Sequence, residues 1–245
     1  MTLAPITQAV VLAAGLGTRL KPITDTMPKP LVPVAGKPMI DYGLDALAEA
    51  GVTRAVVNVH HFADRMEAHL AAYPRLDITI SDERAGLMNS GGGLKKGLAL
   101  LDPGIVYVMN ADLFWIGEKS GSLTNLQRLA GYFDPEMMDM ALLCVPLDHT
   151  TGHNGKKDFQ LDADGRLARY VDGEQPLVYA GAIVLHSALL DDAPDDAFNL
   201  NIYFDKAIEK GRLFGIVMDG EWITVGTPEA LPLAEAVIEG HSGKV

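Results

Sequence analysis

The chain has 245 residues, of which 48% are hydrophobic and 21% charged, a size and composition that fit one α/β domain with a sizeable core. Its formal net charge of −12 argues against a general nucleic-acid or anionic-membrane surface, because both partners require basic patches. Any polyanionic ligand must therefore meet a local concentration of cations. No apolar run reaches transmembrane length and no leader pattern opens the chain, so we expect a cytoplasmic protein. We expect it to be a monomer or a small homo-oligomer.

Short apolar runs alternate with helical patterns through the first half of the chain. The expected strands span 9–12, 55–59, 76–80 and 105–109. The expected helices span 41–50, 63–73 and 94–101, the last opened by a glycine cluster at 90–93. This alternation predicts parallel βαβ units, and hence an α/β fold with a Rossmann-like, mixed but mainly parallel central sheet flanked by helices.

The second half is less regular but shows no repeat, linker or low-complexity segment. The expected elements are a helix at 123–132, a strand at 139–145, a hairpin at 159–166, a strand at 178–185, a helix at 204–210 and a strand at 222–225. A last helix begins at 227 or only at Pro232 and ends near 239, followed by a frayed tail at 241–245. We therefore expect one domain spanning 1–245.

A glycine-rich segment, 13–19, follows the first strand and precedes three cations. Small residues let the backbone approach a ligand and turn its N–H groups toward an anion. Arg19, Lys21 and Lys29 then supply positive charge within about 20 residues, the layout of a nucleotide-phosphate site. A glycine-rich turn after a buried strand is also often only a turn. The dinucleotide fingerprint and the P-loop motif are both absent from the sequence.

Polar residues follow the strand at 105–109, where ligands of parallel sheets collect beyond the carboxyl ends of the strands. Asn110 and Asp112 stand there, and Asp112 is the carboxylate that directly follows a strongly apolar strand in this half. A carboxylate beside a phosphate-binding loop suits Mg²⁺, which shares itself between acidic side chains and substrate phosphates. Capping of the next segment is the alternative role for Asp112.

Other residues of reactive type carry weaker patterns. Adjacent residues point to opposite sides of a strand, so His60 and His61 do not ligate one metal from a strand and are interpreted as structural or surface residues. Cys144, the only cysteine, lies in an apolar run and is interpreted as a small buried hydrophobic residue. No G-x-S-x-G elbow is present, which removes the commonest hydrolase interpretation.

Two linked motifs make a more specific case. The segment L-A-A-G-x-G-T-R-L at 12–20, followed by P-K-P-L-V-P-V-A-G-K-P at 28–38, resembles the signature of the sugar-1-phosphate nucleotidyltransferases. Later segments extend the resemblance over nearly the whole chain, namely S-G-G-G at 90–93, N-A-D at 110–112, Y-A-G at 179–181 and W-I-T-V-G-T-P at 222–228. The family's longer members carry a β-helix of hexapeptide repeats, which is absent after Val225.

The resemblance implies an enzyme that joins a nucleoside triphosphate to a sugar 1-phosphate and releases pyrophosphate, with Mg²⁺ as cofactor. It implies a nucleotide-binding half at about 1–115 and a sugar-phosphate half at about 116–245. The short length and the 158–159 segment look most like the small bacterial members that use UTP and N-acetylmuramic acid 1-phosphate in peptidoglycan recycling. Mannose- and heptose-1-phosphate guanylyltransferases are the nearest alternatives, and a regulatory nucleotide-binding homologue with weakened catalysis is another.

Roles for individual residues follow from the same resemblance. Arg19 would brace the departing pyrophosphate, Lys29 would neutralise charge at the α-phosphate, and Asp112 would hold the metal. The implied nucleotide-binding residues are Leu12, Ala13, Ala14, Gly15, Gly17, Thr18, Arg19, Lys29, Met88, Gly93 and Asn110. The implied sugar-phosphate residues are Lys157, Asp158 and Gly181.

Three positions depart from the family pattern. Thr224 stands where the family has its second metal-binding Asp, and a hydroxyl is a much poorer Mg²⁺ ligand than a carboxylate. Asn89 and Ser90 replace Glu and Thr before the glycines, which alters one side of the base pocket. Lys157 replaces a glycine, so it either crowds the sugar or contacts a sugar phosphate or an acidic substituent.

Overall fold

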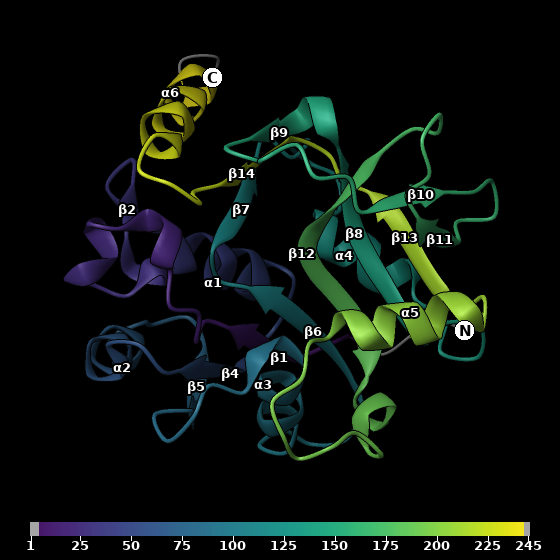
Figure 1. The fold of residues 1–245 in the computed structure, drawn as a ribbon, viewed down its shortest axis with the longest axis horizontal. Coiled ribbons are helices and arrows are strands. Elements are labelled where there is room, and N and C mark those ends of the chain that lie inside the picture. The colour runs from purple at the N-terminus through teal and green to yellow at the C-terminus, as the bar shows by residue number, and fades with distance from the viewer. Residues whose placement is uncertain (1–4, 243–245) are drawn as a thin grey trace.

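The computed structural model describes residues 5–242. A nine-stranded sheet crosses the molecule, with four strands from the first half of the chain and five from the second (Figure 1). Its strands are β1 (Gln8–Leu12), β4 (Arg54–Val59), β5 (Asp77–Asp82), β6 (Ile105–Asn110), β8 (Met140–Pro146), β10 (Phe159–Leu161), β11 (Leu167–Arg169), β12 (Leu177–His186) and β13 (Leu213–Val217). The chain order along the main path is β11-β10-β12-β6-β1-β4-β5, with β8 beside β12 and β13 beside β8.

The half of the sheet from the first part of the chain is parallel. Strand β1 pairs in parallel with both β4 and β6, and β4 pairs in parallel with β5. The second half is mixed, because β12 runs antiparallel to both β6 and β8, while β13 is parallel to β8. A mainly parallel Rossmann-like core with an antiparallel extension is therefore confirmed.

Five helices cover the two faces of this sheet. They are α1 (Met39–Glu49), α2 (Ala63–Ala71), α3 (Asn89–Leu98), α4 (Asn125–Tyr132) and α5 (Asn201–Glu209). Helices α1, α2 and α4 share one apolar core with alternate residues of the strands, and α3 and α5 share the other. Along β4, for example, Val57 faces the first core and Val56 the second. The strands are thus buried on both faces, which explains their continuous apolar runs.

A smaller assembly packs at one end of the sheet. Strands β7 (Leu113–Ile116), β14 (Glu221–Thr224) and β9 (Thr150–Thr151) form a three-stranded sheet, and β2 (Pro33–Val34) pairs with β3 (Lys37–Pro38). Helix α6 (Ala230–Ser242) lies near β2 at the edge of the molecule (Figure 1). Their shared core joins residues 20–39 to the chain's last helix. Three-residue 3-10 turns at Thr18–Leu20, Ile23–Asp25 and Lys29–Leu31 carry the chain between β1 and β2.

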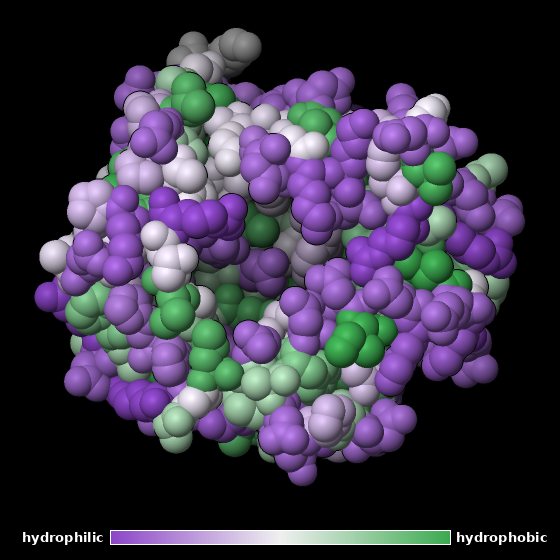
Figure 2. All heavy atoms as spheres, viewed as in Figure 1, coloured by the Kyte–Doolittle hydropathy of each residue, from purple (hydrophilic) through white to green (hydrophobic). Residues whose placement is uncertain are grey.

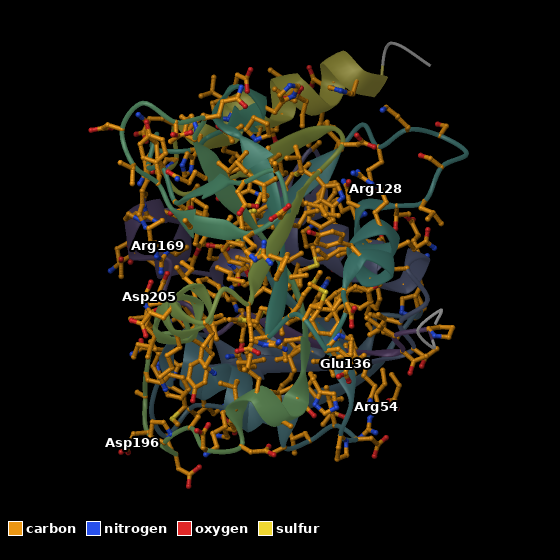
Figure 3. All side chains as sticks on the ribbon, turned by 90° about the vertical axis from the view of Figure 1, so that its right-hand side faces the viewer. Arg54, Arg128, Glu136, Arg169, Asp196 and Asp205 are labelled. Carbon is orange, nitrogen blue, oxygen red and sulfur yellow. The ribbon has the colours of Figure 1, made fainter. Side chains whose placement is uncertain are left out.

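Most predicted elements are confirmed to within a few residues, including the hairpin, now β10 and β11. Figure 3 shows Arg169 of this hairpin directed at Asp205 of α5, with a 2.8 Å ion pair between them. The glycine cluster was placed wrongly: it forms the first turn of α3 rather than a loop before it. A Cβ at Gly91 would lie 2.2 Å from the Phe198 ring, so close packing selects glycine there despite its low helix propensity.

Two further predictions changed at the ends of elements. Strands β7 and β13 were not predicted at all. The last helix begins at Ala230, between the two predicted starts, and includes His241, which was placed in a frayed tail. The remainder of that tail, 243–245, lies outside the described residues.

Candidate active site

A cavity of about 470 Å³ opens where β1 and β6 end. Both strands deliver polar or small residues to its floor, because parallel neighbours end at the same edge of a sheet. Figure 2 shows that this face of the molecule is hollowed near its centre. The predicted site residues that line the cavity are Leu12, Ala13, Ala14, Gly15, Gly17, Thr18, Arg19, Lys29, Asn110 and Asp112.

The loop after β1 folds back on itself through Gly17. This residue has φ +62°, a left-handed conformation that glycine adopts without strain. A Cβ on Gly17 would lie 2.9 Å from side-chain carbons of both Thr24 and Lys29, so the position also requires the missing side chain. The Thr24 hydroxyl donates a 2.8 Å hydrogen bond to the Gly17 carbonyl and fixes the turn. The loop is therefore packed into shape rather than free.

Arg19 projects from the short helical turn that follows. It is exposed, and it makes no hydrogen bond or ion pair with any residue in the described range 5–242. Lys21, the next cation along, instead forms a 3.0 Å ion pair with Asp25 on the surface. Of the cations that follow β1, Arg19 is thus the one left available to an anionic ligand.

Lys29 reaches the cavity from the proline-bounded turn. Its ammonium Nζ lies 2.7 Å from Asp112 Oδ2, which joins two predicted catalytic residues in one ion pair. The Lys29 side chain is 9% exposed, whereas that of Asp112 is 44% exposed at the cavity wall. Burying an ammonium group costs free energy unless a partner compensates it, so the Asp112 carboxylate stabilises the buried position of Lys29.

Asp112 links the large sheet to the small one. It stands two residues after the end of β6 and directly before β7, whose first residue, Leu113, pairs with Thr224 of β14. The Thr224 hydroxyl donates a 3.2 Å hydrogen bond to the Asp112 main-chain carbonyl. Thr224 is therefore beside Asp112, as the family pattern requires of that position, but its hydroxyl is already engaged.

No three His, Cys, Asp or Glu side chains converge on a metal position anywhere in the described part of the chain. The carboxylate of Asp112 is a half-exposed, hard oxygen donor at the wall of the cavity. Mg²⁺ is commonly held by one or two carboxylates together with waters and substrate phosphates. The donor set at Asp112 fits that mode of binding and does not fit a metal cage made by protein alone.

The segment predicted to border the base lies across the cavity from the loop. Leu87, Asn89 and Ser90 line the cavity, whereas the predicted Met88 and Gly93 do not. The Ser90 hydroxyl accepts a 3.0 Å hydrogen bond from the Leu200 N–H, so this departure from the family pattern anchors the segment that precedes α5. Asn89 has φ +57°, a left-handed conformation that asparagine tolerates better than most residues.

The three predicted sugar-phosphate residues lie outside the walls of this cavity. Asp158 accepts a 3.2 Å hydrogen bond from the Tyr179 N–H and pairs with Lys156 at 3.1 Å. Lys157 extends over the Tyr170 ring and donates to its hydroxyl at 3.1 Å. Gly181, at φ +83°, leaves room for Leu113, whose side chain would lie 2.5 Å from an added Cβ. Their roles toward a sugar stay predictions.

Two buried polar residues at the site were not predicted. Asn58 lines the cavity and accepts hydrogen bonds from the N–H groups of Ala13 and Ala14, and Glu83 accepts one from Asn58. Asn58 interrupts the apolar run at 55–59, and a buried amide needs partners to compensate its desolvation, so that interruption was the available signal. Glu83 offered none, because it stands in a charged, loop-like stretch.

The remaining reactive residues behave as the sequence indicated. His60 and His61 point to different partners, the carbonyls of Glu83 and Thr24. Cys144 is fully buried, and burial raises the pKa of its thiol well above the usual range, so the thiol stays protonated. Burial likewise raises the pKa of Tyr179, and the negative charge of Asp112 adds to the rise.

Comparison with known proteins identifies the class. The Nucleotidyl transferase family matches residues 8–130, about half of the chain, including the loop, Lys29 and Asp112. Two solved structures share the fold. The inositol-1-phosphate CTP transferase of T. maritima matches with a TM-score of 0.75 and 16% identity, covering 97% of this chain and 98% of that one. HddC from Yersinia pseudotuberculosis matches with a TM-score of 0.71 and 22% identity, covering 94% of this chain and 99% of that one. This chain therefore belongs to the nucleotidyl transferase family and is an enzyme of that type.

Comparison with individual relatives shows which members of the family this chain is similar to. The chain is 44% identical to the N-acetylmuramate alpha-1-phosphate uridylyltransferase of Caulobacter vibrioides, covering 93% of this chain and 95% of that protein. It is 31% identical to the protein of the same name from Neisseria meningitidis serogroup B, covering 94% and 97%. A mannose-1-phosphate guanyltransferase of Neurospora crassa is 28% identical, covering 91% of this chain but 61% of that protein. Across the described residues, no helix is long and apolar enough to span a membrane.

Proposed function

We propose that this enzyme joins UTP and N-acetylmuramic acid 1-phosphate to form a UDP-sugar and pyrophosphate. The observation that carries the proposal is the 44% identity to the Caulobacter vibrioides uridylyltransferase along nearly the full length of both chains. The cavity supports it chemically, since it combines a glycine-rich loop, an arginine without a partner among residues 5–242 and a lysine–aspartate pair.

The reaction needs no covalent enzyme intermediate. An oxygen of the sugar 1-phosphate attacks the α-phosphorus in line, the bond to the β-phosphate oxygen breaks, and pyrophosphate leaves. The protein therefore acts by holding the two substrates in line and by neutralising charge that develops in the transition state. The loop at 13–19 receives the triphosphate on its N–H groups, as glycine-rich anion sites do.

The cations divide this work by position. Arg19 is exposed and unpaired, and it braces the departing pyrophosphate. Lys29 leaves its 2.7 Å contact with Asp112 or shares it, and it offsets charge at the α-phosphate. Asp112 would hold Mg²⁺, which would supply positive charge to stabilise the negative charge on the phosphates. Asn110, from the end of β6, completes the nucleotide side.

The sugar side uses the strand and loops next to Asp112. Gly181 of β12 lies at an irregularity of the strand and packs against Leu113, and Asp158 is held in place by the Tyr179 N–H. Lys157 is the nearby cation suited to an acidic substituent such as the lactyl carboxylate of N-acetylmuramic acid. On this proposal the enzyme serves peptidoglycan recycling in the cytoplasm, as a monomer or small homo-oligomer.

An activity matrix tests the proposal. UTP, GTP, CTP and ATP are each combined with N-acetylmuramic acid, mannose, heptose and glucose 1-phosphates in the presence of Mg²⁺, and pyrophosphate release is recorded. The proposal predicts the highest kcat/KM for UTP with N-acetylmuramic acid 1-phosphate. Guanylyl transfer to mannose 1-phosphate is the second candidate, favoured by the similarity to the Neurospora crassa enzyme. No pyrophosphate from any combination would refute both.

Thr224→Asp tests whether the missing carboxylate weakens catalysis. Waters and phosphate oxygens complete the coordination of a one-carboxylate magnesium site, so we expect kcat to change by less than about threefold. The measurement is kcat as a function of Mg²⁺ concentration, with Thr224→Val as the control that removes only the hydroxyl. A rise in kcat of more than about tenfold would contradict this view and favour a regulatory homologue with an impaired metal site.

A further inference from the structure

Glu83 and Asn58 are polar residues that are almost completely buried beside the cavity, with 1% and 2% of their surface exposed respectively. Asn58 stands on β4, one position beyond the part that pairs with β1, and its side chain lies on the face covered by α3. Glu83 directly follows β5, the next strand of the sheet. Burying an amide or a carboxylate costs free energy unless its hydrogen bonds are made, so the hydrogen-bond partners of these two side chains indicate what they do.

The hydrogen bonds of Asn58 fix the orientation of its amide. Its Oδ1 accepts from the N–H groups of Ala13 at 2.5 Å and Ala14 at 3.2 Å. Because main-chain N–H groups only donate, the oxygen must face them and the NH₂ group must face the other way. The Nδ2 atom then donates a 2.7 Å hydrogen bond to Glu83 Oε1.

Glu83 extends the chain of hydrogen bonds to the other side of the cavity. Its second oxygen, Oε2, accepts a 3.0 Å hydrogen bond from the N–H of Met88. Met88 stands between Leu87 and Asn89, which line the cavity opposite the phosphate loop. An unbroken path of buried hydrogen bonds therefore runs from the phosphate loop through Asn58 and Glu83 to the base-side segment.

Gly93 makes room for this pair. A Cβ at Gly93 would lie 2.6 Å from Asn58 Nδ2 and 2.7 Å from Glu83 Oε1, closer than real contacts allow. Gly93 does not line the cavity itself. The glycine expected to border the base thus acts on the nucleotide through the two side chains packed against it.

We propose that Asn58 and Glu83 are a positioning pair that holds the phosphate loop at 13–19 in register with the base-side segment at 87–93. The inference rests on the proposed nucleotidyl transfer, because it assigns the two segments to the two ends of one nucleotide. Neither residue touches the reacting atoms. The pair makes binding of the base and binding of the triphosphate mutually reinforcing, which a bare triphosphate does not exploit.

Exchange of the amide and the carboxylate tests the pair. Glu83→Gln places its NH₂ group against another donor, either the NH₂ group of Asn58 or the N–H of Met88. Asn58→Asp places its carboxylate against that of Glu83. Each single change therefore breaks one hydrogen bond. Asn58→Asp combined with Glu83→Gln restores every contact with the polarity of the central hydrogen bond reversed. Ser81→Ala is the matched control, because Ser81 is buried in the same strand pair, opposite Asn58, and its hydroxyl has no hydrogen-bond partner among the described residues.

The readout is the ratio of affinities for UTP and for inorganic tripolyphosphate, measured by calorimetry. Both ligands carry the triphosphate, so the ratio cancels the change in charge near the loop. We expect each single variant to lower this ratio about tenfold or more, and the double variant and Ser81→Ala to keep it within about threefold of wild type. The KM for the sugar 1-phosphate should stay unchanged in all of them.

Two results would overturn the inference: single variants with an unchanged ratio, or a double variant as poor as the worse single. If the single variants do not fold, a double variant that regains the wild-type Tm and ratio supports the pair, and one that stays unfolded overturns it. Turnover of the wild-type enzyme is scored separately. If the wild-type enzyme binds a triphosphate but shows no turnover, the proposed function is refuted. The test of the pair can still be made, with the triphosphate that binds most tightly among the four used in place of UTP.

Discussion

Lys29 and Asp112 come from segments 83 positions apart, yet their side chains form the shortest charged contact in the cavity. The lysine is nearly buried and the aspartate half exposed, so the aspartate is the member of the pair that a metal–nucleotide complex reaches first. In the ligand-free enzyme the ammonium neutralises the carboxylate. On the proposed function, substrate binding redistributes these charges, and both residues act at the centre of the reaction.

Lys29→Ala and Asp112→Ala are each expected to lower kcat by about 100-fold or more, because each removes charge stabilisation that develops in the transition state. Steady-state pyrophosphate release measures the effect, and circular dichroism verifies the fold. Lys119→Ala and Asp102→Ala serve as controls of the same residue types, since both side chains are strongly exposed. An unchanged kcat in either site variant would contradict the assigned role.

At this scale the sequence predicted the residues that belong to local motifs. The loop glycines, Lys29 and Asp112 were identified because each follows a strand or stands in a recognisable segment. Asn58 and Glu83 were not identified, since their roles exist only through contacts between segments 45 and 25 positions apart. The same reason explains Gly93, whose neighbours are those two side chains rather than the cavity.

Asp45 connects helix α1 to strand β3 and to the segment after α2 through hydrogen bonds. It accepts hydrogen bonds from Lys37 of β3 at 2.5 Å and, beyond α2, from Tyr73 at 2.6 Å and Arg75 at 2.9 Å. Burial alone would raise the pKa of the Asp45 carboxyl, but these hydrogen bonds together outweigh it and hold the pKa below its ordinary value of 3.8. The ionised carboxylate is therefore part of the stability of this region.

Asp45→Asn is expected to lower the free energy of unfolding by about 1–3 kcal/mol at pH 7, where the wild-type carboxylate is ionised. A pKa that is lower in the folded than in the unfolded protein gives stability that is present above about pH 4 and lost as the pH falls through the folded value. Urea unfolding of both proteins between pH 7 and pH 3 should show the difference shrinking at acid pH. A difference that is constant over this range would contradict the explanation.

Helices and strands were predicted correctly where their sequence pattern is local. The prediction failed where an element depends on contacts with distant segments. Buried parallel strands and amphipathic helices have patterns that are visible within ten residues. Strand β7 has four residues, and its partner β14 enters more than 100 positions later, so its pairing is not visible from the run itself. The first turn of α3 was missed because glycine disfavours helices, and only the contact with Phe198 explains its presence.

On the proposed function, the nucleotide and the sugar phosphate bind to two parts of one sheet. The parallel half carries the phosphate loop, and the antiparallel extension through β12 brings Gly181 against Leu113, next to Asp112. Alternation of strands and helices predicted the parallel half. It did not predict that β12 pairs with β6, because antiparallel pairing across more than 70 positions leaves no periodic trace in the sequence.

Substrate choice is the claim on which the account depends. A single reaction containing equal concentrations of UTP and GTP, N-acetylmuramic acid 1-phosphate and mannose 1-phosphate, with Mg²⁺, gives the wild-type enzyme every choice at once. Product masses then report the preferred pair directly. The account predicts that the UDP derivative of N-acetylmuramic acid dominates. Dominance of a GDP-sugar, or no nucleotide sugar at all, would contradict it.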